Sequence, residues 1–345
     1  MPTARAEDLE RFATAIFAAH GARPADAALV ARTLVKASLL GHDSHGVLRI
    51  GRYVEKILKK TLHPAAQPKV QHGRGAVALI DGGHGFGQVS ATFGAERAIT
   101  LARAHGVAAV ALGRTNHIGR LGDYAEKISA AGCIALVFAS GAGPGGSVAA
   151  HGGRTRLFGT NPLAWGLPVA AGRGPLIADF STSAVPEGKI GMAQSRGEPL
   201  PPNVMLDATG RPSTQPADFY AGGAILPFGG HKGYSLVLLI ELMANLLAGS
   251  VPASSPEYRV GNPAVLIALE VEAFLPMAEY QRHAEELLRR IESSPPAEGF
   301  SRVLLPNALE LETAARRQRE GIPVPEALWI ELQDLGRAVG VPWSP

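Results

Sequence analysis

Residues 75–82 read GAVALIDG, which is typical of a β-strand, and from this point strand-like and helix-like sequence patterns alternate. A helical segment near 88–104 follows, then VAAVALG (107–113), a second helix from about residue 120, and CIALVFAS (133–140). Alternating strands and helices are typical of an α/β sheet domain whose functional groups lie in the loops after the strands. Taken alone, this alternation favours a parallel sheet.

The region before this sheet is predicted to be helical. Apolar residues recur at helical spacing over 9–16, and Pro24 opens a second helix that runs towards Gly41. A third helix should follow, capped by Asp43 or Ser44, because both side chains can accept hydrogen bonds from the first backbone N–H groups of a helix.

The region after the sheet mixes Pro- and Gly-rich segments with apolar and charged runs. The stretches through residue 230 are interpreted as linkers, and the apolar run 236–247 as a long helix. AVLIALEV (264–271) is predicted to be another strand, and charged helices should continue to the C-terminus.

Composition indicates a globular protein that binds a small molecule. With 345 residues and 46% hydrophobic content the chain can fill a sizeable core, and its net charge of +3 is spread without basic blocks, so no nucleic-acid surface is predicted. The single cysteine, Cys133, excludes an internal disulfide. The charged start (1–12) is unlike a signal peptide, and the run 236–247 is too short for a bilayer. We therefore expect a soluble, cytoplasmic protein without membrane contact.

GHDSHGVLRIGRY (41–53) gathers proton-handling and anion-binding groups in one place. If a helix begins after Ser44, then His45 and Arg49 are four residues apart and project from the same face. Imidazole titrates near neutrality, and the guanidinium fork matches a carboxylate. The pair suits a 2-oxo or 2-hydroxy acid, with Arg49 holding the carboxylate and His45 handling the proton. The alternative is a capped surface helix with solvated polar residues.

His117 lies in RTNHIGR (114–120), a loop after a predicted strand, where α/β proteins place reactive groups. The alternative is a turn histidine that is satisfied by backbone groups. His42, His45 and His117 could also chelate a metal, but no H-E-x-x-H sequence or carboxylate cluster completes a ligand set. We therefore expect no metal site.

Two further stretches could bind a nucleotide. GGHKGY (229–234) ends where an apolar helix begins, so backbone N–H groups would lie near Lys232 and could receive phosphates. DFSTS (179–183) offers hydroxyls and a carboxylate for a ribose or an amide. The alternatives are an ordinary helix start and an ordinary turn.

GAGPGG (141–146) matches G-x-G-x-x-G, but its context does not support a Rossmann site. Pro144 and the residues after it give no convincing helix, and the acidic residue expected roughly 20 positions later is missing. A serine hydrolase is also not indicated, because the chain lacks G-x-S-x-G, and Ser44 and His45 are adjacent and would not face each other on a helix.

Five stretches in this order resemble the malate/L-lactate dehydrogenase family of the second type, also called sulfolactate dehydrogenase-like. The resemblance covers roughly residues 8–340, and its last motif is long and specific. The motifs are GHDSHGVLRIGRY (41–53), TNHIGRLGDYAEKI (115–128), GTNPLAWGLP (159–168), ADFSTSAVPEGKI (178–190) and LPFGGHKGYSLVLLIELMANLLAG (226–249).

The resemblance implies a nicotinamide-dependent oxidoreductase, a cytoplasmic homodimer that uses NADP or NAD on a small carboxylate such as malate, lactate, sulfolactate, ureidoglycolate, diketogulonate or a cyclic imino acid. It implies an α/β fold that is not Rossmann, with a mixed, largely antiparallel sheet plus an N-terminal helical segment. This replaces the parallel sheet, since periodicity does not fix strand direction. The expected parts are a helical segment of the substrate and dimerisation region (1–72), a cofactor-binding sheet domain (73–250) and a C-terminal region that packs back on the dimerisation domain (251–345).

The resemblance also implies roles for individual residues. His45 looks like the acid/base of the family, and His117 is similar to a histidine that some members use as the base near the nicotinamide, so both remain catalytic candidates. The substrate would contact Ser44, Arg49, Thr160 and Asn161. The cofactor would contact His117, Asp179, Ser181, Thr182, Ser183, His231, Lys232 and Gly233.

Three positions depart from the family pattern. Ile118 stands where an aromatic residue is usual, which could change a pocket wall; a P-G-E segment reads Pro-Asn-Ala at 306–308; and Gln215 replaces an acid in T-x-D-P. The altered 306–308 segment motivates a second hypothesis, a catalytically silent nucleotide- or metabolite-binding protein on the same fold. Retention of the histidines, Arg49 and Lys232 argues for the enzyme.

Overall fold

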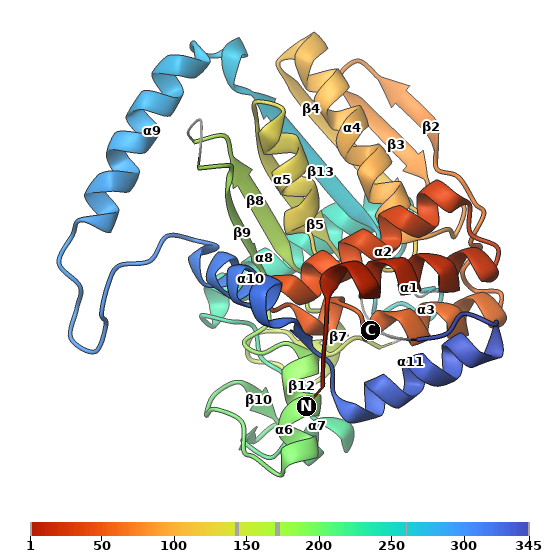
Figure 1. Cartoon of the computed structure of the whole chain (residues 1–345). Helices are drawn as coiled ribbons and strands as arrows, with labels where there is room; N and C mark the ends of the chain where they lie inside the picture. Colours follow the sequence, from red (N-terminus) through yellow and green to blue (C-terminus); the bar gives the residue numbers. More distant parts are fainter. Residues whose placement is uncertain (1, 142–144, 170–172, 260, 344–345) are drawn as a thin grey trace.

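The computed structural model describes residues 2–141, 145–169, 173–259 and 261–343. Its centre is a seven-stranded sheet (Figure 1). In spatial order the strands are β2 (Lys69–Arg74), β3 (Val77–Asp81), β4 (Val107–Gly113), β13 (Ala264–Glu270), β5 (Cys133–Ala139), β8 (Leu163–Leu167) and β9 (Leu176–Phe180).

The sheet is mixed and largely antiparallel. Strands β3 and β4 pair in parallel, as the alternation predicts for a strand, helix and strand unit. Strand β13 comes from much later in the chain, inserts between β4 and β5, and runs antiparallel to both. β8 and β9 add further antiparallel pairs. The parallel sheet predicted from alternation alone is therefore wrong, and the non-Rossmann sheet implied by the resemblance is confirmed.

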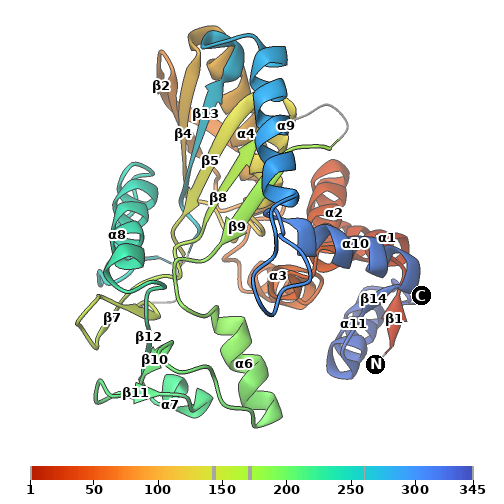
Figure 2. The same ribbon diagram turned by 90° about the vertical axis from the view of Figure 1, so that its left-hand side faces the viewer.

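Helices cover both faces of this sheet. Helices α4 (Gly87–His105) and α5 (Gly122–Ala130) pack on one face, and α8 (His231–Ile240) and the π-helix η2 (Glu241–Leu246) pack on the other (Figure 2). Because side chains alternate along a strand, neighbouring strand residues enter different cores. The face under α4 is lined mostly with alanine and valine, which lets that helix lie close to the sheet.

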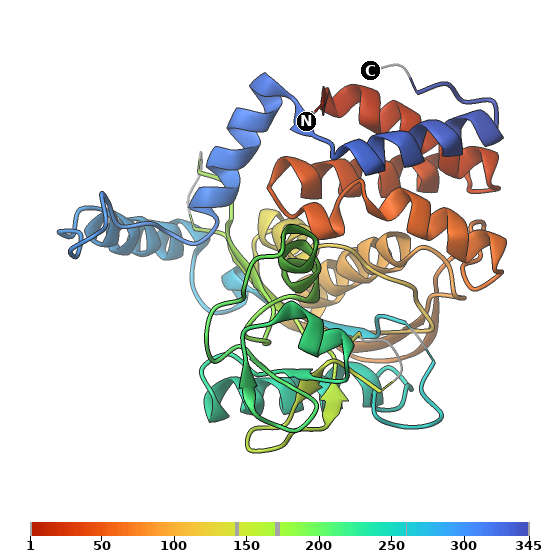
Figure 3. The same cartoon turned by 90° about the horizontal axis from the view of Figure 1, so that it is seen from below.

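A second core lies in the helical region that was expected before the sheet. It contains α1 (Ala6–Ala19), α2 (Pro24–Leu39), α3 (Arg49–Leu58) and, from the C-terminal end, α11 (Glu326–Ala338). β1 (Thr3–Ala4) pairs with β14 (Ile322–Pro323), so the two ends of the chain meet beside these helices (Figure 3).

The interpretation of the stretches through residue 230 as linkers is wrong, because they supply β8 and β9 of the central sheet and also a small sheet with two helices. The strands of the small sheet are only two or three residues long, too short to show an apolar periodicity in the sequence. In spatial order they are β11 (Pro212–Ser213), β10 (Met205–Leu206), β12 (Ala224–Ile225), β6 (Val148–Ala149) and β7 (Arg156–Phe158). The helices are α6 (Glu187–Arg196) and α7 (Pro216–Tyr220).

The predicted strand at 264–271 and the charged helices after it are confirmed. The strand is followed by η3 (Val271–Ala273), α9 (Met277–Glu292) and α10 (Ala308–Glu320), and α9 projects from the body of the molecule (Figure 1). Within the described ranges, none of the helices has the length and apolar character needed to span a membrane.

Candidate active site

The structure brings the two candidate catalytic histidines together. His45 ends the short 3-10 helix η1 (Asp43–His45), and His117 lies in the loop after β4. Their rings stack with centroids 5.3 Å apart and an interplanar angle of 27°. The Ser44 hydroxyl lies 2.9 Å from Nδ1 of His45. Both rings remain partly exposed, so a small molecule can reach them.

Arg49 joins this group, although by a different local structure from the one predicted. The α-helix begins at Arg49 instead of after Ser44, and no capping side-chain hydrogen bond forms at either helix start. Arg49 contacts η1 through its Nε, which donates to the backbone oxygen of Ser44 at 2.6 Å. In the part of the chain that the structure describes, no carboxylate forms an ion pair with Arg49. Its guanidinium can therefore receive a carboxylate from a ligand.

Tyr53 and Gln88 complete the group, and the sequence analysis assigned neither a role. The Tyr53 hydroxyl lies 2.7 Å from Nδ1 of His117, and Gln88 Nε2 donates to that hydroxyl at 2.8 Å. A signal was present for Tyr53, because it follows Arg49 by four residues and so shares its face of α3. Gln88 comes from α4, and nothing local in the sequence connects it to His117.

The loop that carries His117 is fixed from two sides. The Asn116 side-chain amide donates to the backbone oxygen of His84 at 2.8 Å. A Cβ at Gly87 would lie 2.3 Å from the backbone oxygens of Asn116 and His117, so only glycine lets α4 approach this loop. Ile118 is buried in the core under α4, so its departure from the family pattern changes core packing instead of a pocket wall.

Cations surround the histidine pair and keep both rings neutral. Burial and then the charge of Arg49 lower the pKa of His45 to about 3. Burial also lowers the pKa of His117 well below its ordinary value, with Arg49 again the first charge to contribute. Burial raises the pKa of Tyr53 to about 12, so its hydroxyl stays protonated. A bound carboxylate would offset this positive charge and raise the pKa of His45 towards neutrality.

Acid should therefore destabilise the fold through these histidines. Above the unfolded pKa near 6.5 neither state binds the proton, whereas between pH 6.5 and about 3 only the unfolded chain binds it at position 45. We expect the free energy of unfolding to fall by up to about 1.4 kcal/mol per pH unit for each such histidine as pH decreases through this window. Urea unfolding at pH 7, 6, 5 and 4 measures the slope.

His45→Asn should reduce this slope, and His72→Asn, at an exposed position on β2, should leave it unchanged. Equal slopes in wild type and His45→Asn would contradict the lowered pKa of His45.

Thr160 and Asn161 lie just before β8, and Asn161 is tied to α8 and η2. The Asn161 amide donates to the backbone oxygen of Val237 at 3.1 Å and to the Glu241 carboxylate at 2.8 Å. The Glu241 carboxylate is buried and also accepts from Ser140 Oγ at 3.1 Å. Asn161 Oδ1 is buried and has no hydrogen-bond partner within the described chain.

The hydroxyls of 181–183 are largely occupied by the protein itself. Ser181 Oγ and Thr182 Oγ1 both donate to the backbone oxygen of Thr160, at 3.2 and 3.1 Å. Ser183 Oγ donates to the backbone oxygen of Val185 at 2.9 Å. Ser181 is the one of the three that keeps part of its surface exposed. This turn leads into α6, where a Cβ at Gly188 would lie 3.2 Å from Ser44 Cβ, so the turn and the histidine group are neighbours.

Asp179 is directed towards protein groups instead. Its carboxylate accepts from the Gly122 backbone N–H at 2.7 Å, at the start of α5, and lies 3.9 Å from the buried Arg120. Burial raises the pKa of Asp179 in spite of Arg120. Arg120 also donates to Asn307 Oδ1 at 3.4 Å. Asn307 adopts a φ of 69°, the left-handed region that asparagine tolerates, at the position where the family pattern has glycine.

His231 and Lys232 are exposed at the start of α8, as the sequence predicts for an anion site. Neither pairs with a carboxylate in the described residues. A Cβ at Gly233 would lie 1.9 Å from the backbone oxygen of Phe228, so glycine is required for the tight entry into this helix. The His151 ring lies 6.0 Å from the His231 ring and brings the loop after 145 to the same place.

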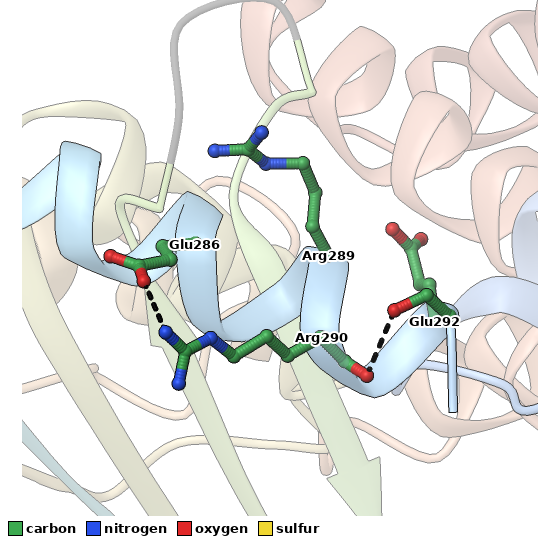
Figure 4. A pocket seen from close by; sticks show the side chains of 5 residues that line it. Glu286, Arg289, Arg290 and Glu292 are labelled. Carbon is green, nitrogen blue, oxygen red and sulfur yellow. Dashed lines mark hydrogen bonds and ion pairs between the residues drawn. The ribbon is translucent and has the colours of Figure 1, made fainter.

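The G-x-G-x-x-G run includes residues 142–144, which lie outside the described residues. Two cavities occur away from the histidine pair. One lies along α9, where Arg289 stands beside an ion pair between Arg290 and Glu286 (Figure 4). The other is bounded by α10 and by the 302–308 segment. In the described ranges, no cluster of His, Cys, Asp or Glu could hold a metal ion.

Comparison with known proteins agrees with this arrangement. Residues 4–333 match the malate/L-lactate dehydrogenase family. The chain is 34% identical to hydroxycarboxylate dehydrogenase B of Escherichia coli (strain K12), over 98% of this chain and 94% of that protein. Among solved structures it resembles sulfolactate dehydrogenase from Methanocaldococcus jannaschii, with a TM-score of 0.91, 30% identity and coverage of 99% and 98%. It also resembles Δ1-piperideine-2-carboxylate reductase from Pseudomonas syringae pvar. tomato, with a TM-score of 0.86, 30% identity and coverage of 97% and 100%. The chain therefore belongs to the malate/L-lactate dehydrogenase family.

Proposed function

We propose that this protein transfers a hydride between NAD or NADP and C2 of a small 2-hydroxy or 2-oxo acid, or of a cyclic imino acid. The observation that carries the proposal is the stacked pair of neutral histidines beside Arg49, a partly buried guanidinium without a carboxylate partner among the described residues. Family membership supports the reaction class, since the relatives include hydroxycarboxylate, sulfolactate and piperideine-2-carboxylate enzymes.

Arg49 would hold the substrate carboxylate through its guanidinium fork, and Ser44 would contact the same end of the substrate. In the oxidation of a 2-hydroxy acid, the hydroxyl proton would pass to Nε2 of His45, which is neutral and can accept it. In the reverse direction the same nitrogen would return the proton to the carbonyl oxygen. Bound NAD or NADP accepts or supplies the hydride. His117, Thr160 and Asn161 would complete the substrate end of the site.

The residues near α8 fit a dinucleotide. The start of that helix presents backbone N–H groups, and the exposed Lys232 and His231 add charge and hydrogen-bond donors for phosphate or ribose groups. Ser181 could contact the cofactor from the neighbouring turn. Asp179 would act mainly by holding the start of α5, because its carboxylate contacts the Gly122 backbone N–H and Arg120.

The experiment that tests the reaction class follows the absorbance of NADH and NADPH separately with a panel of substrates. The panel is pyruvate, oxaloacetate, 2-oxoglutarate, diketogulonate, piperideine-2-carboxylate and pyrroline-2-carboxylate. Turnover with any of them supports the proposal and names the cofactor. Nucleotide binding without turnover on this panel, or on ureidoglycolate in the oxidation direction, would favour a silent binding protein.

Lys232→Ala should weaken binding of the nicotinamide nucleotide on the order of ten- to a hundred-fold, because a charge-assisted hydrogen bond contributes roughly 1.5–3 kcal/mol. Turnover at saturating nucleotide should change little, since Lys232 would contact phosphate or ribose groups of the cofactor and not the reacting atoms. Titration of intrinsic fluorescence with NADH and NADPH measures the affinity. Lys127→Ala on α5 is the matched control, because Lys127 pairs with Glu96 on the protein surface. Equal affinities in both variants would remove Lys232 from the nucleotide site.

We propose further that the protein is a cytoplasmic homodimer, as the family resemblance implies. The division into 1–72, 73–250 and 251–345 stays a prediction. Size-exclusion chromatography with light scattering tests the oligomeric state.

A further inference from the structure

A continuous line of hydrogen bonds runs from α4 to the histidine pair. Gln88 is fully buried, and its Nε2 lies 2.8 Å from the Tyr53 hydroxyl, which is itself 2.7 Å from Nδ1 of His117. Tyr53 is held in place by packing against Phe17 and Phe86, with ring centroids 6.2 Å away in both cases. Gln88 and Tyr53 are therefore held in place and shielded from water, and the line ends at the partly exposed His117 ring.

The protons along this line can be assigned one by one. In this structure the Gln88 amide nitrogen faces Tyr53 and is a donor only, so the Tyr53 oxygen accepts that bond, while Gln88 Oε1 is buried without a hydrogen-bond partner among the described residues. The single proton of Tyr53 then has two possible acceptors, His117 Nδ1 at 2.7 Å and the His117 backbone oxygen at 3.4 Å. The shorter bond is the stronger one. If Tyr53 donates along this shorter contact, Nδ1 of His117 is the acceptor and the neutral ring carries its own proton on Nε2.

We propose that Gln88 is a positioning residue that acts through Tyr53 to fix His117 as its Nε2–H tautomer. In this state His117 donates a hydrogen bond to the substrate oxygen and polarises it, while His45 is the group that moves the proton. The inference rests on the proposed function and deepens it. It assigns different roles to two histidines that the sequence analysis leaves as equal catalytic candidates.

The partner of His45 supports this division. Nδ1 of His45 faces the Ser44 hydroxyl at 2.9 Å, and a serine hydroxyl can donate or accept. The serine hydroxyl can donate to Nδ1 or accept from Nδ1–H, so it can accompany His45 in both charge states while Nε2 takes up and returns the proton. At His117, by contrast, the Tyr53 hydroxyl accepts from the buried Gln88 amide, which favours donation of its own proton to Nδ1 and so restricts the tautomer of that ring. A fixed donor aimed at a developing negative oxygen contributes electrostatic stabilisation without transferring its proton.

The tautomer can be measured directly by ¹⁵N NMR of histidine-labelled protein at pH 7.5, without substrate. The His117 signals are assigned by their loss in His117→Asn. We expect a protonated Nε2 and an unprotonated Nδ1 in wild type. Gln88→Leu removes the amide donor, so the Tyr53 hydroxyl can donate to or accept from Nδ1 of His117. Both neutral tautomers of His117 should then be populated. Ser90→Ala, a buried polar change two residues along α4, should keep the wild-type signals.

The kinetic readout is separate from the NMR readout. Gln88→Leu should lower kcat by about ten-fold with little change in KM, because a fixed donor is partly lost and Arg49 is untouched. A wild-type His117 with its proton on Nδ1, or unchanged tautomers in Gln88→Leu, would overturn the inference. If the tautomer is as expected but no substrate turns over, the proposed function fails while the proton assignment stands.

Discussion

Replacing His45 with asparagine is expected to lower kcat by about 10²- to 10⁴-fold, the range that a positioned general acid or base contributes. Asparagine can keep the contact with the Ser44 hydroxyl but cannot carry the proton, so folding should be retained. The initial rate of reduced nicotinamide formation or loss measures the effect at saturating substrate. KM for the carboxylate should change little, because Arg49 remains in place.

The comparison with His117→Asn makes this prediction specific. Both variants should be slow, but only His45→Asn should remove the titration of kcat, since only His45 changes its proton during the reaction. His117→Asn should keep that titration and lose roughly 10²- to 10³-fold in kcat, as expected for loss of one hydrogen-bond donor to the reacting oxygen. If kcat of His45→Asn stays within a few-fold of wild type, His45 is not the acid/base. If His117→Asn alone loses the titration, the roles are reversed.

How far the sequence predicts the fold depends on the length of each element. Strands such as β4 and β5 and helices such as α2 are long enough to show apolar periodicity, and they were predicted close to their observed bounds. A local sequence pattern does not show which strands from distant parts of the chain pair with each other. Strand β13 separates β4 from β5, which turns a predicted parallel arrangement into antiparallel pairs. The short strands between 148 and 225 show no periodicity and were interpreted as linkers.

The site divides in a similar way. His45, His117, Arg49 and Ser44 could be named from two motifs, because residues with acid/base and anion-binding chemistry stand out in short polar stretches. Their contact could not be derived, since it depends on the turn at η1 and on the loop after β4. No local sequence pattern could indicate a role for Gln88. It acts only through a tertiary hydrogen bond, and its neighbours in sequence belong to an ordinary helix.

Arg49→Ala is expected to lower kcat/KM on the order of a hundred- to a thousand-fold, because loss of one partner of a buried charge pair costs roughly 2–5 kcal/mol. Most of the loss should fall on KM, since the carboxylate is bound in the ground state as well as in the transition state. The charge of Arg49 lowers the pKa of His45, so its removal should also raise that pKa towards 6.5. Steady-state kinetics from pH 5 to 9 measures both effects.

Three variants separate the fork of Arg49 from its charge and from its contact with η1. Arg49→Lys keeps the charge but loses the fork, so it should recover only part of the affinity. Arg52→Ala removes an exposed cation one turn further along α3 and should change kcat/KM by a few-fold at most. Added guanidinium ion should restore activity to Arg49→Ala and leave Arg52→Ala unchanged. A wild-type KM in Arg49→Ala would mean that another cation binds the carboxylate. Loss of activity without any rescue would mean that Arg49 acts through its bond to the Ser44 backbone.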